Sequence, residues 1–369
     1  MNFSYWEIES WFSNIDFTVI GSGIVGLSTA LRLRELHPKS KILILEKGIL
    51  PNGASTKNAG FSCFGSLSEI IDDLQNHTEQ EVLNLIQKRW DGLELLRKNI
   101  GDSNIDFKQF GGFEIYNSDK EFENCREKCQ KINQLLYPIF KESVFSFVDN
   151  KFGFKKTNKQ LAFNKFEGQI DTGLMMQSLL KKAVKNDILI LNNTEVTNIK
   201  DHNKVSIELN NDFTFNTGKV FIATNGFANS LLNEKIKPAR AQVIITKPIE
   251  DLHIKGTFHL NKGYYYFRNI DNRILFGGGR NLDFKTEETT EFGQTKIIQN
   301  KLKEILKTVI LPNTNFEIEH CWSGIMGIGN QKKTIVKQIS NNVFCGIRLG
   351  GMGVAIGSLV GKELAEKLS

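Results

Sequence analysis

Three glycines near the start of the chain have the spacing of a phosphate-binding turn. Gly21, Gly23 and Gly26 follow an apolar run at 17–20 and open a helical pattern, and a second apolar run ends at Glu46. Such glycines allow a tight turn, close approach of the backbone to a pyrophosphate and close packing of helix on strand. A carboxylate about 20 residues later can accept hydrogen bonds from ribose hydroxyls. The pattern favours a dinucleotide-binding strand–turn–helix–strand unit over an ordinary glycine-rich turn.

A segment of small and hydroxyl-bearing residues at 53–61 follows the second apolar run. Small side chains are needed where backbone lies against a cofactor, and hydroxyls supply hydrogen bonds; an ordinary surface loop is the alternative. One convincing glycine fingerprint is present, so we expect electrons from an organic substrate rather than from NAD(P)H. In these two regions the predicted contacts to a dinucleotide are Gly21, Ser22, Gly23, Ile24, Val25, Gly26, Glu46, Lys47, Ser55, Thr56, Asn58, Ala59 and Gly60.

Composition describes an ordinary globular chain and excludes several classes of protein. With 369 residues, 40% hydrophobic and 24% charged, the chain exceeds what one core usually supports, so two lobes are expected. The net charge of +6 comes from scattered basic residues, which argues against nucleic-acid binding. Five cysteines without a Cys-x-x-Cys pair predict neither a disulfide framework nor a metal site. With no leader pattern and no apolar stretch of about 18 residues, we expect a cytoplasmic protein, with peripheral membrane association as the alternative.

Hydrophobic periodicity predicts alternating helices and strands, followed by an antiparallel sheet in the middle of the chain. Helices are expected at 69–99 (two helices), 118–136, 172–185 and 354–368. Strands are expected at 110–116, 188–191, 195–200, 205–209 and 220–223, and antiparallel strands at 242–246, 263–269 and 273–278. The fold class is therefore α/β: a Rossmann-like cofactor domain with an inserted α+β domain built on an antiparallel sheet.

With the segment at 53–61 added to the glycine turn, the chain resembles the FAD-dependent amino acid and amine oxidoreductases, the family of D-amino acid oxidase, glycine oxidase, sarcosine oxidase and D-amino acid dehydrogenase. Later stretches at 167–171, 195–196, 221–226, 322–326 and 349–354 are similar to family segments in the same order, and the resemblance runs from Asp16 to the C-terminus. It implies FAD, without a covalent bond because no cysteine follows Trp322 as in sarcosine oxidase. Further implied contacts to FAD are Val196, Thr224, Asn225, Gly226, Gly324, Arg348, Gly350, Gly351, Met352, Gly353 and Val354.

The resemblance also implies the domains and the reaction. The FAD-binding domain would comprise residues 1–75, 160–235 and 315–369, and the substrate domain residues 76–159 and 236–314. A C–H bond next to nitrogen would be oxidised by hydride transfer to flavin N5, and water would hydrolyse the resulting imine. Amides of the glycines before the terminal helix would stabilise the reduced, anionic flavin. The electron acceptor, whether oxygen, a quinone or a carrier protein, is left open.

The substrate pocket is expected between the flavin and the antiparallel sheet. Strand alternation places Tyr264, Tyr266 and Arg268 on one face, with core packing as an equal alternative. Further candidates are Arg280, as a bidentate clamp for a carboxylate, and Trp322 and Met326 beside the flavin. Many family members carry an arginine soon after the Trp-x-Gly segment, whereas this chain has Ile-Met-Gly-Ile at 325–328. That departure argues against a simple α-amino acid and favours an amine, a substituted amine or a modified amino acid.

Three alternatives remain. A related FAD enzyme could oxidise a 2-hydroxy acid or another alcohol, which requires a base, with His320 the first candidate. A noncatalytic flavin-binding protein would account for the missing arginine. An NAD-linked dehydrogenase would be colourless when purified.

Overall fold

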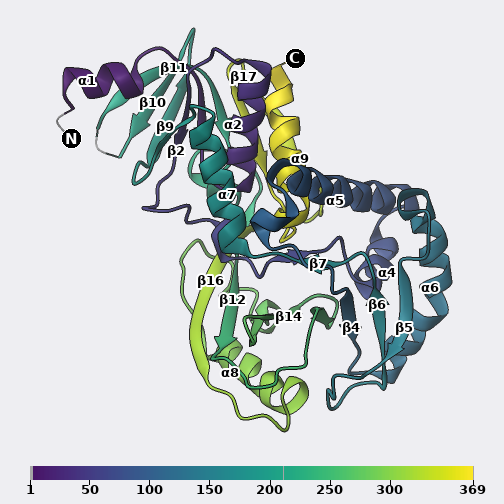
Figure 1. Cartoon of the computed structure of the whole chain (residues 1–369). Coiled ribbons are helices and arrows are strands. Elements are labelled where there is room, and N and C mark those ends of the chain that lie inside the picture. The colour runs from purple at the N-terminus through teal and green to yellow at the C-terminus, as the bar shows by residue number, and fades with distance from the viewer. Residues whose placement is uncertain (1–2, 211, 369) are drawn as a thin grey trace.

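The computed structural model describes residues 3–210 and 212–368, which form two large sheets in the upper and lower parts of the view in Figure 1. The first sheet has eight strands, with β17-β18-β11-β1-β2-β8 as its main order and β9 and β10 extending from β11. Its strands are β1 (Ile15–Ile20), β2 (Ile42–Leu45), β8 (Leu189–Leu191), β9 (Val196–Asp201), β10 (Val205–Leu209), β11 (Thr214–Ile222), β17 (Ile335–Ser340) and β18 (Val343–Ile347). The neighbours β18, β11, β1, β2 and β8 are parallel.

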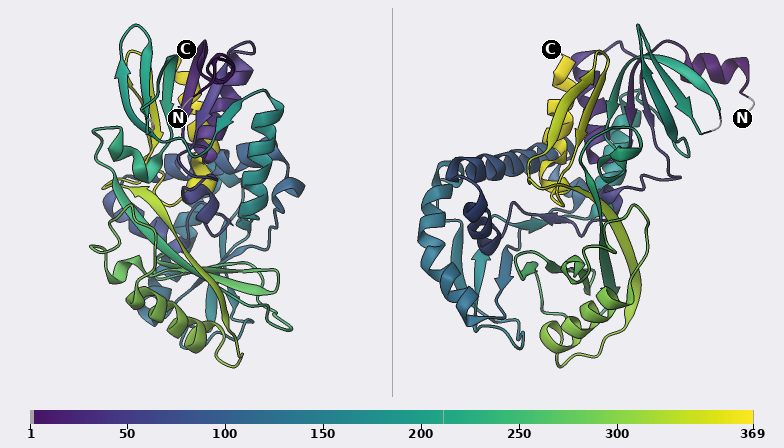
Figure 2. Two further views of the ribbon diagram at one scale, coloured as in Figure 1. Left: turned by 90° about the vertical axis from the view of Figure 1, so that its left-hand side faces the viewer. Right: turned by 180° about the vertical axis from the view of Figure 1, so that it is seen from behind.

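Helices cover this sheet because its central strands are apolar on both faces. All four residues of β2 are buried, as expected for a strand enclosed by crossover helices. The helices near this sheet are α2 (Ile24–Leu36), α5 (Glu79–Ile100), α7 (Thr172–Lys185) and α9 (Gly353–Ala365). Helix α9 lies beside α2, and both views in Figure 2 show the C-terminal helix returning to the N-terminal lobe.

The second sheet also has eight strands, in the order β16-β12-β15-β14-β13-β4-β6-β5. They are β4 (Gly112–Ile115), β5 (Phe145–Asp149), β6 (Gln160–Asn164), β12 (Lys237–Thr246), β13 (Thr257–Leu260), β14 (Tyr265–Ile270), β15 (Arg273–Gly278) and β16 (Ile318–Ile328). Every pairing is antiparallel except that of β13 with β4. Phe258 and Phe267 stack in its core with ring centroids 4.5 Å apart. Helix α8 (Lys296–Ile305) contributes to this core, and α4 (Leu67–Asn76) and α6 (Asp119–Phe140) contribute to a neighbouring one.

Short elements complete the described chain. A two-stranded sheet pairs β3 (Phe61–Ser62) with β7 (Gly168–Gln169), between the large sheets. The remaining helical segments are α1 (Tyr5–Glu7), α3 (Ala54–Lys57), π-helical turns at Ile8–Phe12 and Leu306–Ile310, and 3₁₀ turns at Asp102–Ile105, Asn225–Ser230, Arg280–Leu282 and Glu366–Leu368. Among the described residues, no helix combines the length and apolar character needed to cross a bilayer.

The predicted helices and strands are confirmed, with boundaries that shift by several residues in long strands. Strand β12 begins at Lys237 rather than 242, because β16 pairs with it along its whole length. Asp271 and Asn272 both have positive φ, as a two-residue hairpin turn requires. The α/β fold class is confirmed. Strands β6 and β16 pair in the second sheet although their residues fall in the ranges expected for the cofactor domain, so the domain boundaries stay a prediction.

Candidate active site

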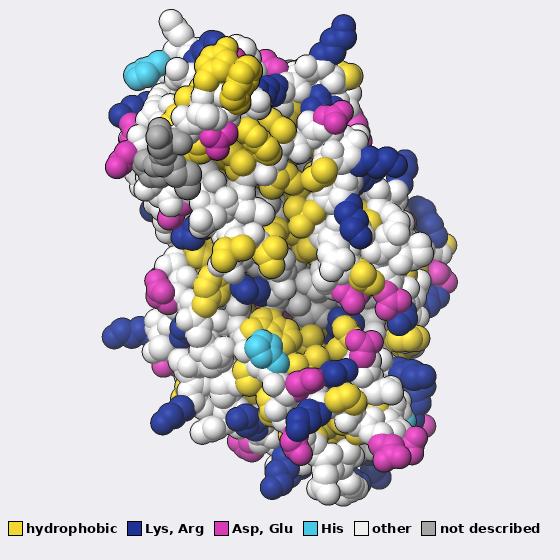
Figure 3. Space-filling model, turned by 60° about the vertical axis from the view of Figure 1, so that its left-hand side comes forward, with side chains coloured by type: hydrophobic (Ala, Val, Ile, Leu, Met, Phe, Trp, Pro, Cys, Tyr) yellow, Lys and Arg dark blue, Asp and Glu magenta, His cyan; other side chains and the backbone are white. Residues whose placement is uncertain are grey.

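A cavity of about 500 Å³ lies where the carboxyl ends of β1, β2 and β11 face the second sheet. Its wall is contributed by the glycine turn after β1, the loop around α3, strands β14 and β16, and the start of α9. Figure 3 shows hydrophobic side chains running along one face of the molecule toward a hollow between its two parts. In open α/β sheets this edge is where ligands bind.

The glycine turn has the close contacts that its sequence predicts. Gly21 has a φ of 101°, which favours glycine. A Cβ on Gly26 would lie 1.8 Å from the carbonyl oxygen of Gly21, so α2 packs directly against the turn. A Cβ on Gly23 would lie 2.8 Å from Oγ of Ser55, which accepts a hydrogen bond from the Ile24 amide at 3.0 Å. The start of α2 therefore faces the cavity through bare backbone.

Glu46 is held at the end of β2 by backbone and hydroxyl donors. Its Oε2 accepts hydrogen bonds from the Ser22 amide at 3.0 Å and the Ser22 hydroxyl at 2.7 Å. Its Oε1 accepts one from the Gly48 amide at 3.0 Å. The carboxylate is buried and lines the cavity. Beside it Lys47, also on the wall, forms an ion pair with Glu195 at 3.2 Å.

The loop before α9 presents a second set of backbone amides. Gly350 and Gly351 have φ of 61° and 83°, and both line the cavity. No side chain caps α9, so amides of its first turn, which includes Gly353, are available to a ligand. Oδ1 of Asn225 accepts hydrogen bonds from the amides of Arg348 at 3.0 Å and Leu349 at 3.3 Å. This side chain ties the loop to the end of β11.

The predicted cofactor residues separate into cavity-lining and supporting groups. Those that line the cavity are Gly21, Gly23, Ile24, Val25, Glu46, Lys47, Ser55, Asn58, Ala59, Val196, Thr224, Asn225, Gly324, Gly350, Gly351, Met352, Gly353 and Val354. Those outside the lining are Ser22, Gly26, Thr56, Gly60, Gly226 and Arg348. Several of these support the wall: Thr56 donates its hydroxyl to the Pro51 carbonyl at 2.7 Å, and Arg348 donates Nε to the Lys333 carbonyl at 2.8 Å.

Strand alternation on β14 separates the predicted substrate residues. Tyr264, just before β14, and Tyr266 on β14 line the cavity, whereas Tyr265 is buried in the core of the second sheet. Burial raises the pKa of Tyr266 to about 12, so its phenol stays protonated at neutral pH. Arg280 also lines the cavity and lies 4.8 Å from the Phe284 ring centroid. Met326 lines the wall on β16.

Arg268 and Trp322 do not line the cavity. Arg268 is buried and donates Nε to the Ala59 carbonyl, and burial lowers its pKa to about 10. Trp322 donates Nε1 to the Lys57 carbonyl at 3.0 Å. Together these side chains hold the end of α3 and the loop after it against the second sheet. His320, the predicted base of the alcohol alternative, is exposed, stacks on Trp322 with centroids 5.8 Å apart, and is also outside the lining.

Sequence reasoning missed His259, which lines the cavity from β13. Its Nε2 lies 2.5 Å from Oε1 of Glu167, which also accepts a hydrogen bond from the Thr257 hydroxyl at 2.8 Å. The ring stands edge-on to Phe61 with centroids 5.3 Å apart. Its register partner is Tyr266. The sequence signal was alternation on 257–260, a segment not assigned as a strand.

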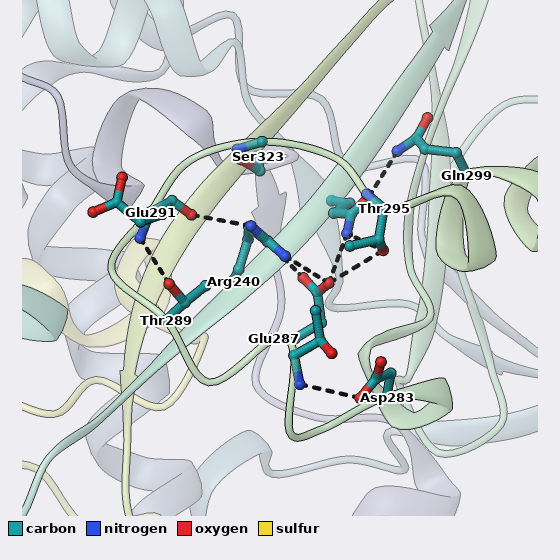
Figure 4. Close-up of polar contacts among 11 residues, drawn as sticks. Arg240, Asp283, Glu287, Thr289, Glu291, Thr295, Gln299 and Ser323 are labelled. Carbon is teal, nitrogen blue, oxygen red and sulfur yellow. Dashed lines mark hydrogen bonds and ion pairs between the residues drawn. The ribbon is translucent and has the colours of Figure 1, made fainter.

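The loop at 283–295 is held by the polar contacts shown in Figure 4. Glu287 receives Nε and a terminal nitrogen of Arg240 at 2.8 and 2.9 Å, and Gln242 donates to the same carboxylate at 3.0 Å. This carboxylate has no exposed surface. The hydrogen bonds that Arg240 donates to Glu287 raise the pKa of Arg240. The loop carries Phe284, whose ring lies 6.0 Å from that of Tyr264.

Comparison with known proteins identifies the family. The model of the DAO family, described as FAD dependent oxidoreductase, matches residues 16–367. The chain belongs to this family. Gamma-glutamylputrescine oxidoreductase of Escherichia coli (strain K12) is 24% identical, over 96% of this chain and 83% of that protein. The L-proline dehydrogenase of P. horikoshii has a TM-score of 0.76 and 19% identity, covering 96% of this chain and 93% of that one. Glycine oxidase of Geobacillus kaustophilus has a TM-score of 0.75 and 17% identity, covering 95% and 94%.

This DAO-family protein is an FAD-dependent oxidoreductase, and its cavity fits the cofactor that the family name implies. At the start of α2 the Ile24 amide donates to Ser55, and the next amides, like those at the start of α9, can offer hydrogen bonds and positive potential to anionic groups. Gly21 and Gly23 line the cavity without side chains, so a pyrophosphate could approach the backbone of the turn there. The buried carboxylate of Glu46 stands at the ribose position of the motif. The family favours FAD over the NAD-linked alternative.

Proposed function

We propose that this protein oxidises a carbon–nitrogen bond in an amine or amino acid, with FAD held noncovalently. The observation that carries the proposal is one continuous cavity, which joins the glycine turn and the start of α9 to the aromatic face of β14. The names of three similar proteins, a gamma-glutamylputrescine oxidoreductase, an L-proline dehydrogenase and a glycine oxidase, support this substrate class. FAD, when bound, would accept the hydride from the substrate carbon.

The chain's own residues would bind and orient the two reactants. Amides at the start of α9 would stabilise negative charge at the cofactor. Tyr266 and Phe61 would form an apolar wall that excludes water and positions the reacting carbon. Arg280, which has no ion-pair partner among the described residues, would attract an anionic group of the substrate.

Oxidation of an alcohol is less well supported by the geometry. That reaction needs a base in contact with the substrate. His320 is outside the cavity lining, and His259, which is inside, is held by Glu167. Burial by itself lowers the pKa of His259, but the Glu167 carboxylate raises it, and the resulting pKa is about 9. A histidine that is protonated at neutral pH is a poor proton acceptor.

The visible spectrum of the purified protein, followed by anaerobic titration with candidate substrates, tests the proposal. The panel comprises D- and L-amino acids, N-methyl amines, polyamines and 2-hydroxy acids. We expect a flavin spectrum that amines or amino acids bleach and 2-hydroxy acids leave unchanged. A colourless protein, or bleaching by hydroxy acids alone, would overturn the proposal, and a coloured protein bleached by none would favour the noncatalytic alternative. Acid precipitation should leave the yellow colour in the supernatant; colour in the pellet would contradict noncovalent binding.

A further inference from the structure

His259 combines a fixed ring position with one open nitrogen. Its Nε2 is engaged by Oε1 of Glu167, and that oxygen is fixed in turn by the Thr257 hydroxyl. Within the described ranges no protein group is hydrogen-bonded to Nδ1. The ring lines the cavity. Nδ1 is not one of the fully buried side-chain atoms that lack a hydrogen-bond partner, so it is not closed off from the cavity. This nitrogen is therefore available to a molecule in the cavity.

The charged groups around His259 favour its protonated form. Burial by itself lowers the pKa of the imidazole, but the charge and hydrogen bond of Glu167 raise it, as do the charges of Glu69 on α4 and Glu114 on β4. The resulting pKa is about 9. The other neighbours with a titratable group are Cys63, whose pKa burial raises well above its ordinary value, and Tyr266 across the strand pair. Both of these groups are neutral at pH 7.

The protonation state decides what Nδ1 offers to a ligand. In the imidazolium both ring nitrogens carry hydrogen, so Nδ1–H donates into the cavity while Nε2–H donates to Glu167. After loss of one proton, the carboxylate of Glu167 retains the hydrogen on Nε2, and Nδ1 becomes an acceptor. The protonated ring therefore offers a hydrogen-bond donor, which suits a carboxylate or carbonyl oxygen.

We propose that His259, positioned by Glu167, binds an acceptor group of the substrate, such as a carboxylate, through Nδ1–H. The inference rests on the proposed function and narrows its substrate class to amines that also carry such a group. It supplies a carboxylate-binding residue in a chain that lacks the arginine expected after the Trp-x-Gly segment. Arg280, elsewhere on the cavity wall, remains free to bind a second anionic group.

A metal ion is the competing occupant of this cluster. The ligand atoms of Cys63, Glu167 and His259 lie within 4.8 Å of one another. Metal binding requires a thiolate and a neutral imidazole. Burial and the surrounding acids instead favour a neutral thiol and a protonated imidazole, so the arrangement suits a hydrogen-bonded pair.

The test measures binding of benzoate to the flavin-loaded protein between pH 7 and pH 9.5, by calorimetry and by the change in the flavin spectrum. A group with a pKa of about 9 should weaken benzoate binding about fourfold over this range. Benzamide should show a weaker dependence, because its amide can accept a hydrogen bond from Nδ1–H or donate one to the neutral Nδ1. In the His259→Gln protein benzoate should bind at least about fourfold more weakly at pH 7, and the pH dependence should be absent.

A Glu167→Gln variant separates a role of the His259–Glu167 pair in binding from a purely structural role, because it should shift the pH at which benzoate affinity is lost. Without the carboxylate the pKa of His259 falls, so the loss of benzoate affinity should begin at lower pH. The matched control is His320→Gln, an exposed histidine outside the cavity lining, which should behave like the parent. If the flavin-loaded protein binds benzoate with an affinity that is independent of pH, the inference about His259 is overturned while the proposed function stands. One equivalent of zinc in the purified protein would have the same consequence. A protein without flavin would instead overturn the proposed function.

Discussion

At the scale of single residues, the glycine at position 26 decides how closely α2 approaches the turn after β1. A Cβ there would lie 1.8 Å from the Gly21 carbonyl oxygen and 3.0 Å from its carbon. Both are backbone atoms, so no change of side-chain rotamer can relieve the contact. The start of α2 can reach the cavity only while position 26 has no side chain.

We therefore expect Gly26→Ala to lower the free energy of unfolding by about 1–3 kcal/mol, since overpacking forces the backbone to shift. The same shift should reduce the flavin content, measured as the ratio of visible to ultraviolet absorbance. Gly173→Ala, in the first turn of α7, is the matched control because its Cβ would meet only the Asp171 side chain, at 3.2 Å. Equal stability and flavin content in the two variants, measured by urea unfolding and absorbance, would contradict this account.

At the scale of elements, the loop at 283–295 is anchored to β12 by one buried ion pair. Arg240 and Glu287 form two parallel hydrogen bonds, and the carboxylate has no exposure to solvent. The loop brings Phe284 against Tyr264 and beneath Arg280. Loss of the anchor should therefore affect both stability and the substrate end of the cavity.

The Glu287→Gln variant should lose about 3 kcal/mol of unfolding free energy, because it leaves the buried Arg240 without a charged partner. In the proposed reaction it should also raise KM more than it lowers kcat. The control Glu317→Gln removes an exposed ion pair to Lys247, which should cost less than about 1 kcal/mol. Similar urea midpoints for the two variants would show that the anchor has no special role.

The start of α9 is the second element with a direct chemical consequence. Its free amides should stabilise an anionic flavin, so the loaded protein should form a sulfite adduct, seen as bleaching of the visible band. A Cβ at Gly353 has no protein atom within 4 Å, so a side chain there would enter the cavity without a clash with the chain. Gly353→Asp should weaken sulfite binding relative to the uncharged Gly353→Asn. Failure of the parent to bind sulfite would count against this role for α9.

At the scale of the whole molecule, the cavity exists because two sheets built from separate parts of the chain face each other. The loop after α3 links them: Arg268 from β14 donates to the Ala59 carbonyl, and Trp322 from β16 donates to the Lys57 carbonyl. Glu167 and His259 join the small central sheet to β13. The buried polar groups at this junction therefore couple the active site to the stability of the fold.

The His259–Glu167 pair should make stability depend on pH. The folded-state pKa of His259 is raised from 6.5 to about 9, so its stabilising contribution is complete below pH 6.5 and is lost as pH rises through 9. Urea unfolding of the parent should show decreasing stability across this window, and His259→Gln should show a flatter profile. The His320→Gln control should match the parent. Parallel profiles for the parent and His259→Gln would contradict the raised pKa.

The sequence by itself determined the turns and helix starts, which depend on residues only a few positions apart. The glycine turn, the hairpin at 271–272 and the helix opening after Asp171 could be predicted because turn geometry, backbone φ and capping involve residues a few positions apart. Alternation on β14 correctly separated Tyr264 and Tyr266 from Tyr265. The ordered set of motifs from Asp16 onward was sufficient to identify the family.

Only the tertiary structure decided which of these residues reach the cavity. Arg268 lies on the face that alternation predicts, yet its guanidinium is used by the loop after α3, a contact between residues 209 positions apart. His259 and Glu167, 92 positions apart, meet because β13 pairs with β4 and the Glu167 carbonyl accepts a hydrogen bond from the Gly111 amide, just before β4. Periodicity specifies the face of a strand, whereas the partner of a buried polar group depends on long-range packing.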